Sequence, residues 1–161
     1  MKGKLRFYLG SLIILPTLVA CSGGVSSCLD DGISMEQVQR YLEQEKRQEL
    51  INQLTIRAES GESAAQYFLG FLQWTESEEL AFSWFKRSAE RGCLEGMLHV
   101  AQSYSEGQGV VQDYAQSFEW YMKAAKGGDS SAAKMVAHMY RPGQGVEKDL
   151  EQARYWASQS W

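Results

Sequence analysis

The chain's two histidines are the first residues to consider for chemistry, because imidazole serves both as a general base and as a metal ligand. His99 and His138 lie 39 residues apart, outside a His-Glu-x-x-His motif and away from any cysteine pair with zinc spacing. The Gly-x-Ser-x-Gly motif of a nucleophilic serine is also missing from the sequence. The sequence therefore predicts no catalytic residue, no metal site and no cofactor.

A glycine-rich loop occurs twice and raises the question of phosphate binding. Residues 107–113 (Gly-Gln-Gly-Val-Val-Gln-Asp) return 36 residues later as 143–149 (Gly-Gln-Gly-Val-Glu-Lys-Asp). Neither second glycine is followed directly by lysine, and no strand is expected before either loop, so the phosphate-binding pattern is not met. We interpret the motif as a turn in which glycine allows positive φ, with Asp113 and Asp149 capping the next helix.

The same offset of 36 residues relates aromatic residues on both sides of the loops. Tyr104 returns as Tyr140, and Trp120 returns as Trp156. A fixed period of this size indicates stacked helical hairpins, each of which contacts mainly its neighbours. Each repeat is expected to open at a glycine, and tryptophan is expected to fill the space between hairpins. The predicted repeats are residues 61–91, 92–127 and 128–161, opened by Gly61, Gly92 and Gly128.

The repeated pattern Tyr-x-x-Gly-x-Gly-Val-x-x-Asp-x-x-x-Ala/Ser-x-x-Trp-x-x-x-Ala-Ala-x-x-Gly is similar to the Sel-1-like repeat, a relative of the tetratricopeptide repeat. The resemblance covers residues 61–161 and is weakest in the first repeat, whose turn is shorter. It implies an all-α fold, an α/α superhelical solenoid that holds partner proteins. Residues 34–60 are expected to form an N-terminal helical cap, because Ser34 and Gln37 have the spacing of a capping box.

The first residues have the composition of an export signal. Three basic residues precede the apolar run 7–15. The tetrad 18–21 (Leu-Val-Ala-Cys) resembles the bacterial lipobox, which implies cleavage before Cys21 and a lipid on its sulfur; Ser22, rather than aspartate, implies sorting to the outer membrane. The alternative is an ordinary secretory signal in which Cys21 has no special role. The expected segments are a signal peptide at 1–20 and a lipidated, flexible tether at 21–33.

Removal of residues 1–20, which carry three basic and no acidic residues, takes the net charge from −4 to about −7. An acidic domain without a basic stripe argues against nucleic acid, and against membrane attachment by anything except the lipid. Cys28 and Cys93 remain once Cys21 is used. They pair if the compartment is oxidising, or Cys93 is a small buried residue at a helix start.

The candidate binding surface is a stripe on the first helix of each hairpin, at i, i+4, i+7 spacing. It changes from aromatic in the first repeat to basic in the third. The aromatic residues either bind a partner or pack against residues 34–59, whereas an acidic partner segment is expected at the basic end. The stripe consists of Tyr67, Phe71, Trp74, Leu98, Gln102, Ser105, Lys134, His138 and Arg141.

These features favour a lipid-anchored, non-catalytic module that faces the periplasm and holds a protein or peptide. A second interpretation is an immunity lipoprotein that neutralises a secreted toxin, such as a lipase-type effector, since a small acidic domain with few repeats suits an inhibitor. A third, a cell-wall enzyme, requires catalytic residues that the sequence does not offer.

Overall fold

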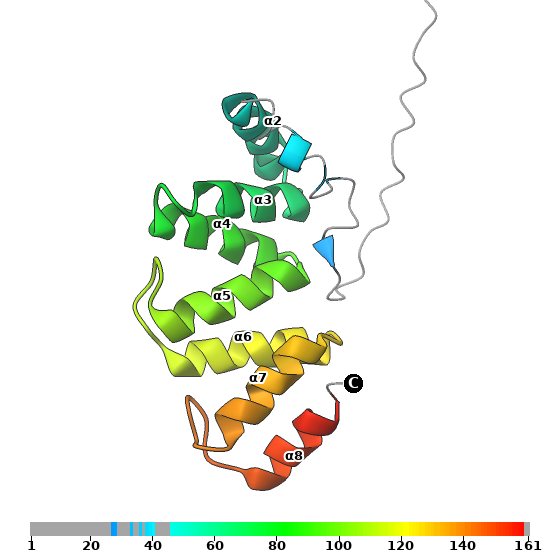
Figure 1. Ribbon diagram of the computed structural model, residues 1–161, viewed down its shortest axis with the longest axis vertical. Helices are drawn as coiled ribbons and strands as arrows, with labels where there is room; N and C mark the ends of the chain where they lie inside the picture. Colours follow the sequence, from blue (N-terminus) through cyan, green and yellow to red (C-terminus); the bar gives the residue numbers. More distant parts are fainter. Residues whose placement is uncertain (1–26, 29–32, 34–35, 37, 41–45, 160–161) are drawn as a thin grey trace, which may run out of the picture.

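The computed structural model describes residues 27–28, 33, 36, 38–40 and 46–159. The long elements of this part are helices that follow one another in a single elongated stack (Figure 1). They are α2 (Arg47–Glu59), α3 (Ser63–Gln73), α4 (Glu78–Glu90), α5 (Leu94–Glu106), α6 (Tyr114–Lys126), α7 (Ser130–Tyr140) and α8 (Leu150–Ser158).

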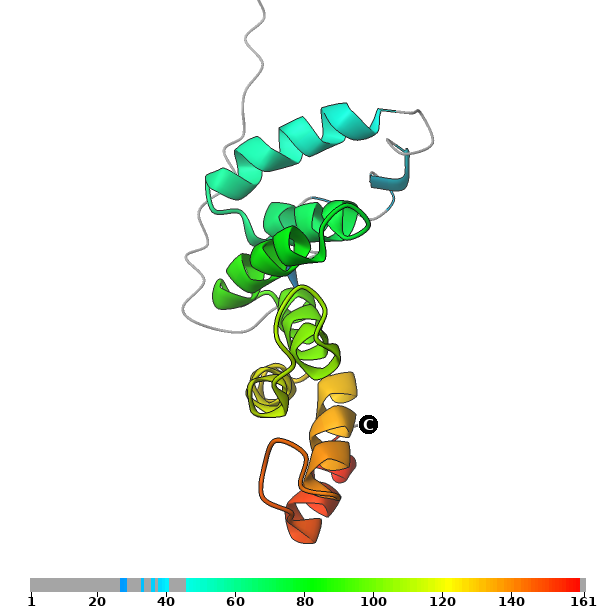
Figure 2. The same cartoon turned by 90° about the vertical axis from the view of Figure 1, so that its left-hand side faces the viewer.

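Three helical hairpins make up the stack: α3 with α4, α5 with α6, and α7 with α8. We call the first helix of each hairpin helix A and the second helix B. Each helix packs chiefly on the helices before and after it in the chain. The loops that join helix A to helix B lie along one edge, and the stack bends along its length (Figures 1 and 2). The predicted all-α solenoid is confirmed.

The N-terminal helical region is not one unbroken helix. Residues 36 and 38–40 are helical, but Lys46 has non-helical backbone angles, and α2 begins after it without a side-chain cap. Helix α2 buries Leu50 and Leu54 and packs on α3, so it covers the first hairpin. The proposed capping-box residues Ser34 and Gln37 lie outside the described residues. So do the signal peptide, Cys21 and the first part of the tether.

The loop between helices A and B has the predicted turn and cap. The Asp113 carboxylate accepts hydrogen bonds from the backbone N–H groups of Ala115 and Gln116, at 2.9 and 3.0 Å. Asp149 caps α8 in the same way, through two N–H groups at 2.9 Å each. Gly107 ends α5 with φ of 75°, in the left-handed region where glycine is favoured.

The second glycine of each loop lets the loop lie directly on the preceding hairpin. A Cβ atom on Gly109 would lie 2.1 Å from the carbonyl oxygen of Glu78, at the start of α4. One on Gly145 would lie 2.0 Å from the carbonyl oxygen of Tyr114, at the start of α6. Only glycine permits this approach, so the loops help to set how one hairpin sits on the next.

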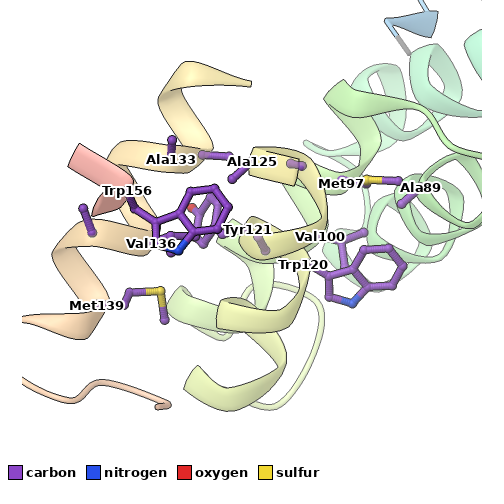
Figure 3. Close-up of a cluster of buried hydrophobic side chains, with 14 of the residues drawn as sticks. Ala89, Met97, Val100, Trp120, Tyr121, Ala125, Ala133, Val136, Met139 and Trp156 are labelled. Atoms are coloured by element: carbon purple, nitrogen blue, oxygen red, sulfur yellow. The ribbon is translucent and has the colours of Figure 1, made fainter. Parts of the chain in front are cut away.

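Small residues and tryptophans form the core between hairpins, as predicted. Val100 and Val136, 36 residues apart on α5 and α7, are both 0% exposed. Trp120 and Trp156 belong to the same buried cluster (Figure 3). The corresponding residue of the first hairpin, Trp84, is only half-buried. Apolar burial between successive hairpins therefore holds the stack together.

A disulfide ties the start of the described chain to the second hairpin. Cys28 and Cys93 are bonded, with Cα atoms 4.9 Å apart. Cys93 is also buried at the N-cap of α5, where its sulfur accepts from the N–H of Gly96 at 3.3 Å. Glu95 adds to the junction by accepting from Ser27 Oγ at 2.6 Å and from the backbone N–H of Cys28 at 3.0 Å. Of the two interpretations of Cys93, the structure has the pairing with Cys28, and the paired cysteine lies buried at a helix start.

Candidate partner-binding surface

The predicted stripe lies on the three A helices, and we call it the helix-A surface. Its residues occupy equivalent places on α3, α5 and α7. Two of them, Trp74 and Arg141, directly follow α3 and α7 as C-cap residues. Because α3, α5 and α7 succeed one another along the stack, the aromatic and basic ends of the surface lie at different heights (Figure 1). The two ends of this surface differ sharply in how much of each side chain is exposed to solvent.

Two aromatic residues of the α3 end are engaged in packing. The Tyr67 and Trp74 ring centroids lie 5.8 and 5.5 Å from the centroid of Phe85 on α4. Tyr67 also packs against the buried cluster to which α2 contributes Leu50. Packing against residues 34–59 was one of the two alternatives for these residues. Among the described residues, their ring–ring contacts are with Phe68 of α3 itself and with rings of α4 and α5.

His99 of α5 lies at the centre of these rings. Its imidazole stacks on Phe85, with centroids 4.5 Å apart and planes 11° apart, and its Nε2 lies 3.5 Å from the Tyr67 hydroxyl. Its Nδ1 is buried, and no described residue hydrogen-bonds to it. Burial lowers the pKa of His99, because a buried imidazolium would lose hydration. His99 is therefore a neutral packing residue, which the stripe did not include.

Phe71 and Gln102 are the more accessible residues of the upper and middle surface. Phe71 is 44% exposed, so an apolar ring is presented to solvent at the α3 end. Gln102 is exposed on α5, where its amide nitrogen donates to Glu106 Oε1 at 3.0 Å. Ser105 turns inward to the backbone, donating to the Gln102 carbonyl at 2.9 Å. Leu98, the apolar residue of the middle, packs against the main buried cluster, so the accessible part of the middle is polar.

The α7 end presents three basic side chains. Lys134, His138 and Arg141 are all exposed. Within the part of the chain that the structure describes, none of them makes a hydrogen bond or salt bridge. Residues three and four apart on a helix lie on one face, so these side chains converge on one patch. We call Lys134, His138 and Arg141 the basic patch.

One group of possible metal donors occurs among the described residues: Cys28, Cys93 and Glu95. The two sulfurs are bonded to each other, which removes the thiolates that a metal would need. Of the histidines, His99 has aromatic neighbours and His138 is exposed on α7. No helix in the described ranges is both long and apolar enough to cross a lipid bilayer.

The stacked hairpins and the surface along their A helices define an α-helical repeat protein of the solenoid class. The family model described as Sel1 repeat matches residues 63–93, 94–129 and 130–160, each starting two residues after the glycine predicted to open it. The chain belongs to the Sel1 repeat family, as its sequence pattern predicted. Proteins of this family generally act as protein-interaction modules.

Solved structures support the assignment. The chain is 35% identical to c5321, a protective antigen of uropathogenic Escherichia coli strains, with a TM-score of 0.64 over 68% of this chain and 25% of that one. It therefore spans about a quarter of that relative. A Sel1 repeat protein from Oxalobacter formigenes is 27% identical, with a TM-score of 0.63 over 68% of this chain and 87% of that one.

A more distant match shows the fold alone. Helicobacter pylori cysteine rich protein B is 16% identical, with a TM-score of 0.57 over 71% of this chain and 87% of that protein. No curated protein sequence matches this chain with significance.

Proposed function

We propose that this protein is a non-catalytic, envelope-facing interaction module that holds an acidic protein or peptide segment at the basic patch. The observation that carries the proposal is the exposure of Lys134, His138 and Arg141 without a partner among the described residues. They stand on a domain whose net charge is about −7 once residues 1–20 are removed. A cationic patch on an anionic body attracts carboxylates and repels basic partners.

The aromatic end has a supporting role in this proposal. Tyr67 and Trp74 are already packed on Phe85, so they form a rigid wall rather than a set of free anchors. Phe71 remains exposed and offers one apolar contact. A partner segment would therefore be held mainly by charge at the α7 end and would gain apolar contact only where it reaches α3.

Location outside the cytoplasm is part of the proposal. The Cys28–Cys93 bond supports it, because structural disulfides persist in oxidising compartments. Attachment by a lipid on Cys21 is proposed from the sequence tetrad at 18–21. A Cys21→Ser variant should lose palmitate labelling and leave the membrane fraction. Labelling that persists in this variant would overturn the lipid anchor without touching the proposed binding site.

The binding site itself is tested by site-specific photo-crosslinking in cells. A photoreactive phenylalanine in place of His138 should capture a partner, because residue 138 is exposed within the basic patch. The same group at Glu119, exposed on α6, serves as the matched control. Equal capture from both positions, or capture from Glu119 alone, would place the partner elsewhere.

A further inference from the structure

A cavity of about 360 Å³ opens where the end of α2, the start of α3 and the end of α4 meet. These three helices succeed one another at one end of the stack (Figure 1). The lining is mainly polar and includes no residue of the helix-A surface. Ligand sites in proteins measure roughly 300–1,000 Å³, so this volume suits a small molecule. The lining residues are Ala58, Glu59, Gly61, Gln66, Arg87, Glu90 and Arg91.

Gln66 of α3 brings a buried amide group to this cavity. It is 3% exposed, and its Nε2 donates to the carbonyl oxygen of Ala58 at 2.9 Å. That hydrogen bond fixes the orientation of the amide, because the carbonyl acceptor must face the NH2 group. The other end of the amide, Oε1, is buried and accepts no hydrogen bond from any described residue. A buried acceptor without a donor is unfavourable, so a ligand N–H group at Oε1 would be bound with a net gain.

The repeat fold does not require glutamine at this position. The equivalent residues of the second and third hairpins, 31 and 67 residues further along the chain, are Met97 and Ala133. Both are apolar and buried. The Ala58 carbonyl oxygen also has a second donor, the backbone N–H of Gly61 at 3.1 Å. Packing and helix capping therefore leave the Gln66 carbonyl oxygen without a role.

Two guanidinium groups and two carboxylates line the cavity without pairing with one another. The Arg91 guanidinium lies against Gly61, where an added Cβ atom would be 2.7 Å from Nη2. Arg87 lies over the Trp84 ring, 4.9 Å from its centroid. Within the part of the chain that the structure describes, none of the four charged groups makes a salt bridge or a side-chain hydrogen bond. The two carboxylates are those of Glu59 and Glu90.

We propose that this cavity, which we call the Gln66 cavity, binds a small zwitterion in which an ammonium and a carboxylate lie close together, as in a free amino acid or a dipeptide. The ligand carboxylate pairs with Arg87 and Arg91, whose guanidinium groups offer forked N–H donors. The ammonium donates to Gln66 Oε1 and to the carboxylate of Glu59 or Glu90.

The arrangement selects against ligands that carry a single charge. A lone anion would leave the Gln66 oxygen and both carboxylates without a donor, and a lone cation would leave both guanidinium groups unpaired. The inference goes beyond the proposed function, because the Gln66 cavity shares no residue with the basic patch.

The probe for this site is the dipeptide L-alanyl-L-alanine, titrated into isotope-labelled protein and followed by NMR. Saturable shifts are expected in the side-chain NH2 signals of Gln66. N-acetylation and C-terminal amidation of the dipeptide each remove one charge, and each should weaken binding by about tenfold or more. L-Alanine keeps both charges and separates the two sources. Affinity equal to that of the dipeptide identifies a free amino acid as the ligand, and weaker binding identifies a peptide.

Variants of the protein assign the contacts. Gln66→Met introduces the residue of the second hairpin, so the melting temperature should stay nearly unchanged while dipeptide affinity falls about tenfold. Gln73→Met is the matched control, because Gln73 Oε1 is also buried without a partner among the described residues but does not line the cavity. It should keep full affinity. Arg91→Gln should weaken binding of the dipeptide but not of its C-terminal amide.

Several results would overturn the Gln66 cavity as a zwitterion site. They are an absence of saturable shifts, equal affinity for the dipeptide and both blocked forms, and binding that depends on the carboxylate but not on the ammonium. Arg91 is exposed, so Arg91→Gln keeps the test decisive if Gln66→Met disturbs the fold. Lys134→Glu, in the basic patch, should leave dipeptide affinity unchanged. Failure at the Gln66 cavity would therefore leave the proposed function untouched.

Discussion

His99 shows at the residue scale how a titratable side chain is used for packing rather than chemistry. It stacks on Phe85 and lies 3.5 Å from the Tyr67 hydroxyl, in a site where burial disfavours the charged imidazolium. Burial, with a smaller contribution from the Glu95 carboxylate, raises the pKa of Tyr67 as well. Both groups therefore remain neutral at physiological pH and act as one apolar cluster.

The pKa of His99 predicts a pH dependence of stability. Because burial lowers this pKa below its ordinary value of 6.5, the unfolded chain takes up the proton first as the pH falls. The contribution of His99 to the free energy of unfolding should be complete above about pH 7 and decline as the pH falls through 6.5 toward the folded pKa. In His99→Phe, the melting temperatures at pH 7.5 and 5.5 should differ less than in the unmodified protein. His138→Gln is the matched control, and equal pH dependence in all three proteins would contradict the account.

There is a physical reason why the sequence did not reveal that His99 belongs to an aromatic cluster. Its stacking partner comes from the preceding hairpin, so the contact depends on how two hairpins pack and not on spacing within one helix. The stripe on the A helices, in contrast, follows from helical periodicity alone. That periodicity placed Lys134 and His138 on an exposed face, but it did not distinguish packed Trp74 from exposed Phe71.

At the scale of elements, the loop between helices A and B helps to set the distance between successive hairpins. Gly109 has positive φ and also lies against the backbone of α4, whereas Gly128 has φ of 98° with nothing within 4 Å of an added Cβ. Gly128→Ala should therefore cost only the strain of positive φ, about 1–2 kcal/mol. Gly109→Ala should cost about 1–3 kcal/mol more, because a clash with backbone cannot be relieved by a rotamer change. Urea unfolding of both variants measures the difference, and equal losses would show that the loop does not hold the hairpins together.

Trp120 tests the packing between hairpins. It is 7% exposed within the main buried cluster, so Trp120→Ala should lower the free energy of unfolding by about 3–5 kcal/mol. Tyr155→Ala removes a ring that is 53% exposed, so it should change the free energy of unfolding by only about 0.5 kcal/mol. A loss below about 1 kcal/mol for Trp120→Ala, judged against the usual cost of a core cavity, would place this ring at the surface.

Local signals explain which elements could be predicted. Asp113 and Asp149 identify helix starts because capping involves residues only two and three positions away. The structure of residues 34–60 was harder to predict, because apolar positions alone do not say where a helical region is interrupted. Lys46 lies at such an interruption and has no side-chain cap to mark it. The disulfide depended on the folded path of the chain, which brings Cys28 to the start of α5.

At the scale of the whole molecule, the stack has two different ends. Helix α2 covers the α3 end, where the aromatic residues of the helix-A surface are partly packed, whereas the α7 end presents the basic patch. An acidic body with positive charge gathered near one end orients an approaching acidic partner by its field. Binding should accordingly weaken as salt concentration rises, since exposed charges are screened within about 10 Å at 0.1 M ionic strength.

The central claim is that the basic patch binds the partner. Calorimetric titration tests it most directly, with the partner captured at His138 titrated into a charge-reversed protein. In Lys134→Glu/Arg141→Glu, affinity should fall by about tenfold or more, because interfacial charge pairs cost roughly 2–5 kcal/mol when lost. Circular dichroism and melting temperature should stay nearly unchanged, since both residues are exposed. The control Lys46→Glu/Lys126→Glu changes the net charge equally at exposed sites off the surface and should keep full affinity. Equal affinity of both double variants would contradict binding at the basic patch.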